Sequence, residues 1–131
     1  MVTRSLRYAL CFVVLLALRA GAQEPAGGPA QVDPVVVSPD RFTVLLENPH
    51  VRVVEYVLLP GQRDQWHTLP PKVSYVVAGG TLRITTEDGR SFLATEKRGS
   101  ATWMDALGRH FAENLGKTPV RILLVEVKSA S

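Results

Sequence analysis

Residues 73–95 read VSYVVAGGTLRITTEDGRSFLAT, and this stretch decides the fold class. It holds three short runs rich in Val, Leu, Ile and Thr, which are separated by Gly-Gly at 79–80 and by Asp-Gly at 88–89. Glycine-containing breaks between such runs are typical of β-hairpins, because glycine readily adopts the positive φ that tight turns require. In the middle run Arg83 and Thr85 alternate with apolar residues, as in a strand with one buried face. The stretch predicts consecutive antiparallel strands.

The same pattern continues on both sides of this stretch. Short β-type runs alternate with Pro, Gly and Asn, and no segment shows sustained helical periodicity or a repeat of fixed period. A chain of 131 residues has room for one domain. Many short strands at this spacing predict an all-β domain that closes into a sandwich or a small barrel. We expect strands near residues 42–47, 51–59, 73–78, 81–86, 90–95, 101–104, 109–114 and 119–127.

Two of the expected strands, 51–59 and 119–127, are apolar on both faces. In the first, Val54, Tyr56 and Leu58 occupy one face, and Val and Leu occupy most positions of the other. Successive side chains of a strand point to opposite faces, so both faces of these strands call for burial. We expect them to lie between two packed layers or at a subunit interface, which would make the protein a homodimer.

The N-terminus has the layout of a secretory signal peptide. Arg4 and Arg7 precede an apolar run at residues 8–18, and Ala-Gly-Ala at 20–22 forms a small-residue cleavage site. The run is shorter than the roughly 20 residues that a membrane-spanning helix needs. We therefore predict that residues 1–22 are cleaved, that no stable membrane anchor remains, and that the protein is exported to the periplasm or secreted. The alternative is an uncleaved anchor.

Cleavage would change the charge balance of the chain. The whole sequence has 15 Lys+Arg against 12 Asp+Glu and a formal net charge of +3. Arg4, Arg7 and Arg19 would leave with the signal peptide, so residues 23–131 are balanced in charge. A balanced domain without a basic cluster is a poor binder of nucleic acid, and we expect none as a partner. The one cysteine, Cys11, would also leave, which excludes a disulfide framework.

Residues 23–40 are rich in Pro and Gly, which predicts a linker or arm before the domain. Its one candidate for a short strand is Val35-Val36-Val37. We expect the folded barrel domain to occupy residues 41–128.

Two glycine-led patterns each contain one histidine. Residues 61–80 read G-x5-H-x12-G with His67, and residues 99–114 read G-x10-H-x3-N with His110. These spacings resemble the two motifs of the cupin superfamily, G-x5-H-x-H-x3-E-x6-G and G-x5-P-x-G-x2-H-x3-N, as found in small single-domain cupins of the type-2 kind. The identical positions are Gly61, His67 and Gly80 in the first motif and Gly99, His110 and Asn114 in the second.

The resemblance implies a jelly-roll β-barrel over about residues 42–128 with a site in its interior. In metal-binding cupins the ligands are the two His and the Glu of the first motif and the His of the second. Here His67 and His110 keep two of these positions, whereas Leu69 and Val73 stand at the other two. The metal-binding motif is therefore degenerate, and of its ligands only His67 and His110 remain to hold a divalent transition metal, with a non-motif ligand beside them in a metal-dependent enzyme.

Leu69 and Val73 offer no lone pair, and stable sites for transition metals usually have three or more protein ligands. A metal bound by two imidazoles would be bound weakly, and we expect no cofactor. An apolar side chain at the Glu position suits a barrel without a metal, because a buried carboxylate needs a compensating cation. The site then becomes an apolar cavity with a few polar groups, which is typical of a small-molecule pocket.

The two histidines are the main candidates for polar contacts in such a pocket. If they lie close together, their titrations couple, and the pair could share a proton or hydrogen-bond a ligand carboxylate or carbonyl. Tyr75 shares strand parity with Val73, so we expect it to face the cavity if Val73 does. The alternative for the aromatic candidates is an ordinary place in the core. The predicted pocket residues are His67, His110, Tyr75, Leu69, Val73, Trp66 and Trp103.

Three functions remain open from the sequence. The first is an exported cupin-like barrel that binds, or also processes, a small organic molecule in its interior. The second is a metal-dependent cupin enzyme of the oxygenase or isomerase type that uses His67 and His110. The third is a structural homodimer without catalysis. The residues do not decide whether the chain is an enzyme, since cupins host many chemistries.

Overall fold

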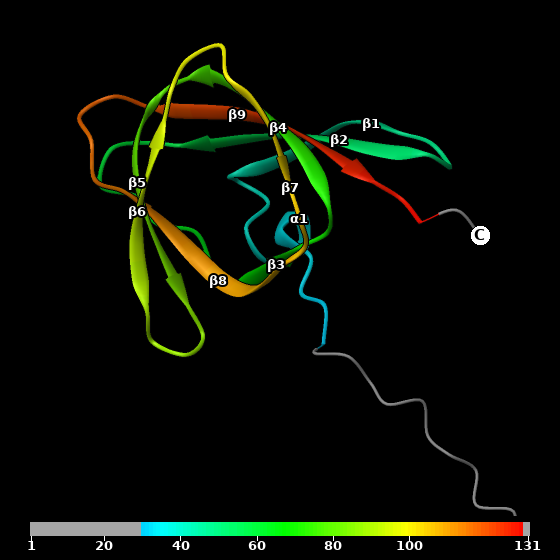
Figure 1. Ribbon diagram of the computed structural model, residues 1–131, viewed down its shortest axis with the longest axis horizontal. Coiled ribbons are helices and arrows are strands. Elements are labelled where there is room, and N and C mark those ends of the chain that lie inside the picture. The colour runs from blue at the N-terminus through cyan, green and yellow to red at the C-terminus, as the bar shows by residue number, and fades with distance from the viewer. Residues whose placement is uncertain (1–29, 130–131) are drawn as a thin grey trace, which may run out of the picture.

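A computed structural model describes residues 30–129 of the protein. These residues form an antiparallel β structure with one short helix (Figure 1). The predicted all-β class is confirmed, and every predicted strand is present. The pattern missed one strand of three residues, β3, because so short a strand shows no alternation. The elements are α1 (Pro34–Val37), β1 (Phe42–Glu47), β2 (Val51–Leu58), β3 (His67–Leu69), β4 (Lys72–Ala78), β5 (Gly80–Thr86), β6 (Ser91–Glu96), β7 (Ala101–Met104), β8 (Leu107–Asn114) and β9 (Val120–Val127).

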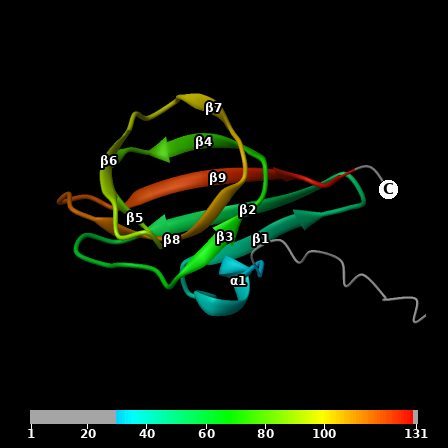
Figure 2. The ribbon, with the colours of Figure 1, turned by 60° about the horizontal axis from the view of Figure 1, so that its bottom comes forward.

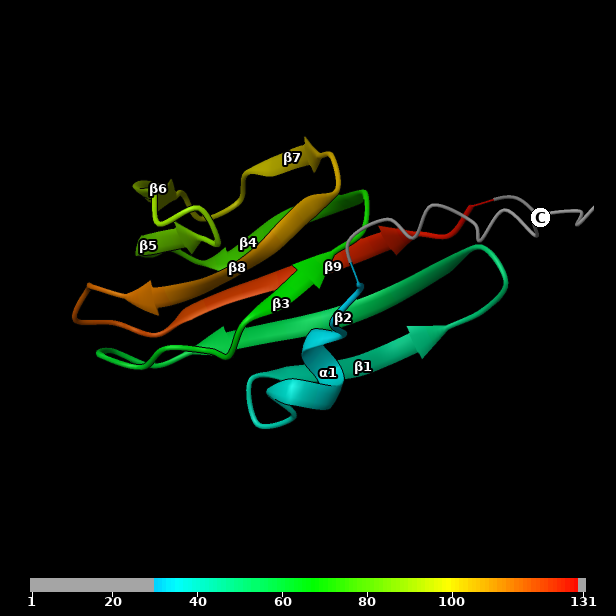
Figure 3. The ribbon, with the colours of Figure 1, turned by 90° about the horizontal axis from the view of Figure 1, so that it is seen from below.

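The strands form two sheets that enclose the interior of a jelly-roll barrel (Figures 1 and 3). One sheet has five strands in the order β1-β2-β9-β4-β7, and the other has four in the order β3-β8-β5-β6. The pairings are antiparallel, and the chain passes from one sheet to the other between β4 and β5. This arrangement confirms the predicted barrel.

Most of the core lies on the inner face of the five-stranded sheet, and Leu69, Leu82 and Ala112 of the four-stranded sheet complete it. On β2 the residues Val54 and Leu58 are fully buried, and on β9 Val120 is fully buried with Ile122 beside it. The two strands pair in register, with Leu58 opposite Val120. The even-numbered residues of both strands therefore supply the apolar layer that closes the barrel.

The outer face of the same two strands is not fully buried, which corrects one expectation. Val53 and Val125 are register partners on this face and are only half-buried. Their row continues through Val73 to Trp103, whose side chain is 55% exposed. Within residues 30–129 no second layer covers this face, so the strands do not lie between two packed layers. A subunit interface on this face stays a prediction.

Two glycines are required where the chain crosses between the sheets. A Cβ on Gly79 would overlap the carbonyl oxygen of Glu96, and a Cβ on Gly80 would lie 2.7 Å from Cγ2 of Val120. Both approaches are closer than real side chains tolerate, so only glycine fits the turn between β4 and β5. Gly80 is also one of the motif positions, and this close packing is its structural role.

The segment before the barrel is folded, and the expectation of a strand at 35–37 is wrong. Asp33 caps a single helical turn by accepting a hydrogen bond from the Val35 amide at 3.0 Å, and Pro34 stands where its missing N–H costs nothing. The helix α1 lies against β1 and β3 (Figure 2). The Val32 amide also donates to the Thr68 hydroxyl at 3.0 Å. Residues 32–38 are thus attached to the barrel.

The predicted signal peptide, residues 1–22, lies outside the described residues, as do residues 23–29 of the predicted linker. No helix within residues 30–129 has the length and apolar character to cross a membrane.

Candidate functional site

A cavity of about 100 Å³, here called the inner cavity, lies inside the barrel between the two sheets. Its walls are mostly aliphatic and aromatic side chains from both sheets. This composition, apolar with a few polar groups, is the general character of small-molecule sites. The polar lining residues are Tyr56, Asp64, His67, Lys72, Ser74, Glu96 and His110.

His67 and His110 meet in this cavity. They are register partners on β3 and β8, and their ring centroids lie 4.3 Å apart. Both side chains are almost completely buried, at 1% and 3% exposure. The pairing of two short strands therefore brings together two histidines that lie in separate sequence motifs.

Each imidazole is held by a backbone carbonyl close to it in sequence. Nδ1 of His67 lies 2.7 Å from the Gln65 oxygen, and Nδ1 of His110 lies 2.7 Å from the Gly108 oxygen. A carbonyl oxygen only accepts, so each Nδ1 carries the proton and donates it. Among the described residues neither Nε2 has a hydrogen-bond partner, which leaves Nε2 as the atom available to a ligand.

Burial keeps both imidazoles neutral near pH 7. Burial is the largest cause that lowers the pKa of His67. For His110, burial first and the nearby His67 second lower the pKa to about 4. Neutral imidazole with a proton on Nδ1 has its lone pair on Nε2, so the pair offers two hydrogen-bond acceptors.

Lys72 is a third nitrogen group in the cavity, and the sequence analysis did not identify it. It begins β4, its side chain is 1% exposed, and it lines the inner cavity. The one hydrogen bond of its ammonium is a long one, 3.5 Å to the Pro70 oxygen. Burial lowers the pKa of Lys72, against the opposing effects of Glu126 and Asp105. A single buried lysine gives no periodic signal that the sequence could reveal.

Asp64 and Tyr56 form a buried hydrogen-bonded pair beside the histidines. The Tyr56 hydroxyl donates to Asp64 Oδ2 at 2.8 Å, and the Ala112 amide donates to Oδ1 at 2.8 Å. Burial is the main cause that raises the pKa of both groups. Phe42 stacks on Tyr56 with ring centroids 4.4 Å apart and meets His67 edge-on at 5.2 Å. The sequence analysis missed this pair, which fixes the wall of the cavity.

Two predicted pocket residues on β4 face away from the cavity. Tyr75 is 43% exposed, and Val73 lies on the same outer face. Lys72 and Ser74 are the β4 residues that line the cavity. Val73 and Tyr75 lie on the same face of β4, as predicted. That face points outward rather than into the cavity, and the sequence did not reveal this because both faces of the strand carry apolar side chains. Of the four metal-motif positions, only Val73 therefore lies outside the cavity.

The two predicted tryptophans also lie outside the inner cavity. Trp66 packs edge-on against Phe111 with ring centroids 4.7 Å apart, and Arg109 lies above it. Trp103 is largely exposed and donates from Nε1 to Asp105 at 3.1 Å. Leu69, in contrast, lines the cavity as predicted and pairs with Leu107. Trp103 lies outside because it is the register partner of the outward-facing Val73, and Trp66 comes directly before β3.

The residues present do not fit the divalent metal that metal-binding cupins hold. Leu69 faces the cavity without a lone pair, Val73 points outward, and the Lys72 ammonium would repel a cation. Within residues 30–129 no group of three His, Cys, Asp or Glu side chains is arranged to hold a metal ion. Two imidazoles beside a lysine therefore fall short of the three or more protein ligands that stable transition-metal sites usually have.

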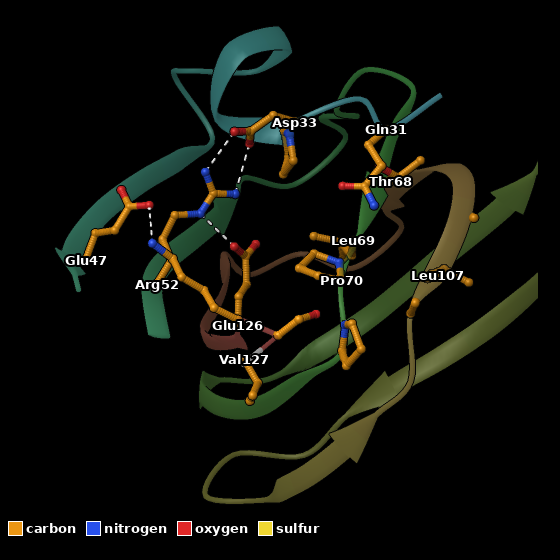
Figure 4. A pocket seen from close by; sticks show the side chains of 16 residues that line it. Gln31, Asp33, Glu47, Arg52, Thr68, Leu69, Pro70, Leu107, Glu126 and Val127 are labelled. Atoms are coloured by element: carbon orange, nitrogen blue, oxygen red, sulfur yellow. Dashed lines mark hydrogen bonds and ion pairs between the residues drawn. The ribbon is translucent and has the colours of Figure 1, made fainter. Parts of the chain in front are cut away.

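A second, larger cavity of about 640 Å³, here called the vestibule, lies next to α1 and is lined in part by Asp33, Arg52 and Glu126. Arg52 forms ion pairs with both carboxylates: its Nη1 lies 2.7 Å from Oδ2 of Asp33, and its Nε lies 2.6 Å from Oε2 of Glu126 (Figure 4). Leu69 and Leu107 line both cavities, so the vestibule adjoins the inner cavity at this leucine pair.

The architecture and its site place the chain among proteins of known fold. A cupin-domain protein from Bordetella pertussis is 26% identical with a TM-score of 0.62, over 67% of this chain and 92% of that one. A protein with a double-stranded β-helix domain from Klebsiella pneumoniae is 24% identical with a TM-score of 0.51, over 77% and 87%. An RmlC-like cupin from Methanocaldococcus jannaschii is 16% identical with a TM-score of 0.52, over 80% and 86%. The chain belongs to the cupin superfamily, as its motif spacings predict.

No family model matches the chain, and no curated protein matches it in sequence.

Proposed function

We propose that this cupin binds a small organic molecule in the inner cavity without a metal ion. The observation that carries the proposal is the histidine pair, with ring centroids 4.3 Å apart and both Nδ1 atoms tied to backbone carbonyls. This arrangement leaves two Nε2 acceptors in an otherwise apolar cavity. A ligand with a hydroxyl or another N–H or O–H donor would satisfy them.

The size of the cavity limits the ligand. Its volume is about 100 Å³. A compound of a few carbon atoms with one or two polar groups fits such a volume. Aliphatic walls such as Leu82, Ile84 and Ile122 would contact its carbon atoms.

Two further proposals concern the metal and the location of the protein. Because a buried ammonium opposes a cation, we expect the purified protein to be free of metal. Elemental analysis checks this, and stoichiometric iron, manganese, zinc or nickel retained through dialysis would favour the metal-dependent enzyme instead. Residues 1–22 support export to the periplasm or outside the cell.

The binding proposal is tested by nuclear magnetic resonance of the imidazole groups. A panel of short alcohols, ketones, amides and carboxylic acids is titrated to millimolar concentration while the signals of His67 and His110 are followed. We expect some members to shift both signals. In His110→Leu the affinity for these members should fall at least tenfold, because a hydrogen bond inside the cavity is lost.

The matched control is His50→Leu, because His50 is an exposed histidine outside the cavity. This variant should bind like the unchanged protein. If no compound of any class shifts the two cavity histidines, the proposed function is wrong.

A further inference from the structure

Lys72 is a buried cation, and the function proposed above gives it no role. Its side chain is 1% exposed, and none of the ion pairs among the described residues includes it. Its one acceptor is the Pro70 oxygen at 3.5 Å. Lysines are almost never fully buried unless they are paired, because removing the charge from water is costly. Lys72 therefore lacks an ion-pair partner among the described residues.

The carboxylate opposite Lys72 in register is engaged through one of its two oxygens. Glu126 lies opposite Lys72 on β9, and its Oε2 accepts from Arg52 Nε at 2.6 Å, whereas its Oε1 is buried without a hydrogen-bond partner among the described residues. Arg52 is in turn fixed by Asp33 through two hydrogen bonds of 2.7 and 3.0 Å (Figure 4). The residues of these ion pairs, Asp33, Arg52 and Glu126, line the vestibule. The ion pairs hold Glu126 Oε2 toward Arg52, and Glu126 forms no ion pair with Lys72, which lines the inner cavity.

The topology places Lys72 at the histidine end of the inner cavity. The chain turns between β4 and β5, so Lys72 at the start of β4 and Thr86 at the end of β5 lie at the same end of the barrel. Thr86 is the register partner of His110, which pairs with His67. The lysine and both imidazoles are close enough for the charge of Lys72 to lower the pKa of both histidines. Three nitrogen groups therefore converge at one end.

We propose that the ligand is a short-chain hydroxy acid, whose carboxylate contacts the Lys72 ammonium and whose hydroxyl donates to Nε2 of His67 or His110. This inference rests on the proposed function, since it names the ligand class of the same cavity. A carboxylate alone would leave the two Nε2 acceptors without a donor, and an alcohol alone would leave the ammonium without an anion. A molecule with both groups satisfies the buried polar atoms on each side.

The acidic groups of the cavity do not compete for this position. Asp64 is occupied by the Tyr56 hydroxyl and the Ala112 amide. Glu96 is the register partner of Gly80, at the end of the cavity opposite Lys72, and burial raises its pKa. The carbon chain of the ligand would extend from the basic end toward the apolar middle of the cavity. The titratable groups around the inner cavity are Tyr56, Asp64, His67, Lys72, Glu96 and His110, with Asp33, Asp105 and Glu126 next to it.

Ligands of matched shape test the inference on the unchanged protein. Lactate and 3-hydroxypropionate carry both groups, propionate lacks the hydroxyl, and lactamide keeps the hydroxyl but lacks the charge. Affinities are measured by titration of the His67 and His110 signals at constant ionic strength. We expect at least one hydroxy acid to bind ten times or more tightly than both propionate and lactamide, because charge-assisted hydrogen bonds are the strong ones.

A variant of Lys72 tests the same contact from the side of the protein. Lys72→Met keeps the shape of the side chain and removes its charge, so the affinity for the hydroxy acid should fall at least tenfold while that for lactamide stays the same. Lys97→Met is the matched control, because Lys97 is an exposed lysine. We expect the thermal midpoint of Lys72→Met to equal or exceed that of the unchanged protein, since an unpaired buried charge is lost. If Lys72→Met does not fold, the ligand comparison alone decides.

The outcomes separate the two proposals. If lactamide binds as tightly as the hydroxy acids, or if folded Lys72→Met binds them normally, Lys72 is not the anchor and the small-molecule site still stands. If propionate binds as tightly as the hydroxy acids, the contact of the hydroxyl with the histidines is wrong. If none of these compounds and no neutral compound shifts the cavity histidines, both proposals fall.

Discussion

At the scale of single residues, burial decides the chemistry of the site. His110 shows this most clearly, because burial and the neighbouring His67 lower its pKa to about 4. The same two side chains on the surface would be ordinary histidines that titrate near pH 6.5. Inside the barrel they remain neutral acceptors throughout the physiological range, and the Nδ1 contacts decide which nitrogen is available.

The lowered pKa of His110 predicts how stability depends on pH. Between pH 6.5 and about 4 the unfolded chain binds a proton at this histidine that the folded chain does not bind. The free energy of unfolding should therefore decrease as the pH falls through this window, by on the order of 3 kcal/mol from His110. His67 acts in the same direction, whereas the raised pKa values of Asp64 and Glu96 act in the opposite direction.

Denaturant titrations between pH 7 and pH 4 check this prediction. His110→Leu should flatten the dependence in this window, and His50→Leu should leave it unchanged. An imidazole of His110 that titrates near pH 6.5 in the folded protein would contradict the assignment.

At the scale of elements, the strand pairings bring together residues that no local pattern connects. The pairing of β3 with β8 places His67 beside His110, and the crossing from β4 to β5 places Lys72 at the same end. The crossing depends on Gly79 and Gly80, because the backbone of β6 and the Val120 side chain occupy the space of their missing side chains.

The crossing predicts a large effect of a small substitution. Gly79→Ala would force its methyl group against the carbonyl oxygen of Glu96, and the backbone must move to relieve the overlap. We expect a loss of stability of about 1–3 kcal/mol or more, measured by thermal or denaturant unfolding. Gly108→Ala is the matched control, because a Cβ there meets nothing within 4 Å. Equal stabilities of the two variants would mean that the turn has more freedom than this packing allows.

At the scale of the whole molecule, the barrel includes part of the segment that the composition marks as a linker. Asp33 caps α1 and also pairs with Arg52 of β2, and Val32 is bonded to Thr68 of β3. Pro34 is almost completely buried. Residues of this short arm, Asp33 and Pro34 among them, thus line one side of the vestibule.

Two truncations test the contribution of this arm. Removal of residues 1–29 should leave the cooperative unfolding transition intact, because it keeps the contacts of residues 32–38 with the barrel. Removal of residues 1–38 should lower the thermal midpoint by several degrees, because about 1–3 kcal/mol of ion pairing and burial is lost. Identical midpoints for the two truncated proteins would show that α1 adds nothing to the barrel.

The resemblance of two motif spacings predicted the cupin barrel, whereas strand patterns were sufficient to predict the all-β class and the strand positions. They rest on side-chain alternation and on turn residues, which are local properties of the chain. These local patterns could not predict which face of β4 points into the barrel. Val73 and Tyr75 are as apolar as a core face, and Lys72 and Ser74 are the residues that lie inside.

The sequence by itself determined that the chain forms a small antiparallel barrel, and that the first motif lacks two metal ligands. It also predicted His67 and His110 as pocket residues. Only the tertiary structure decided that the two imidazoles touch, that Lys72 joins them, and that Tyr75, Val73, Trp66 and Trp103 lie outside the cavity. The physical reason is that alternation along a strand is set by near neighbours, whereas the inward face of β4 depends on the strands that pair with it from distant parts of the chain.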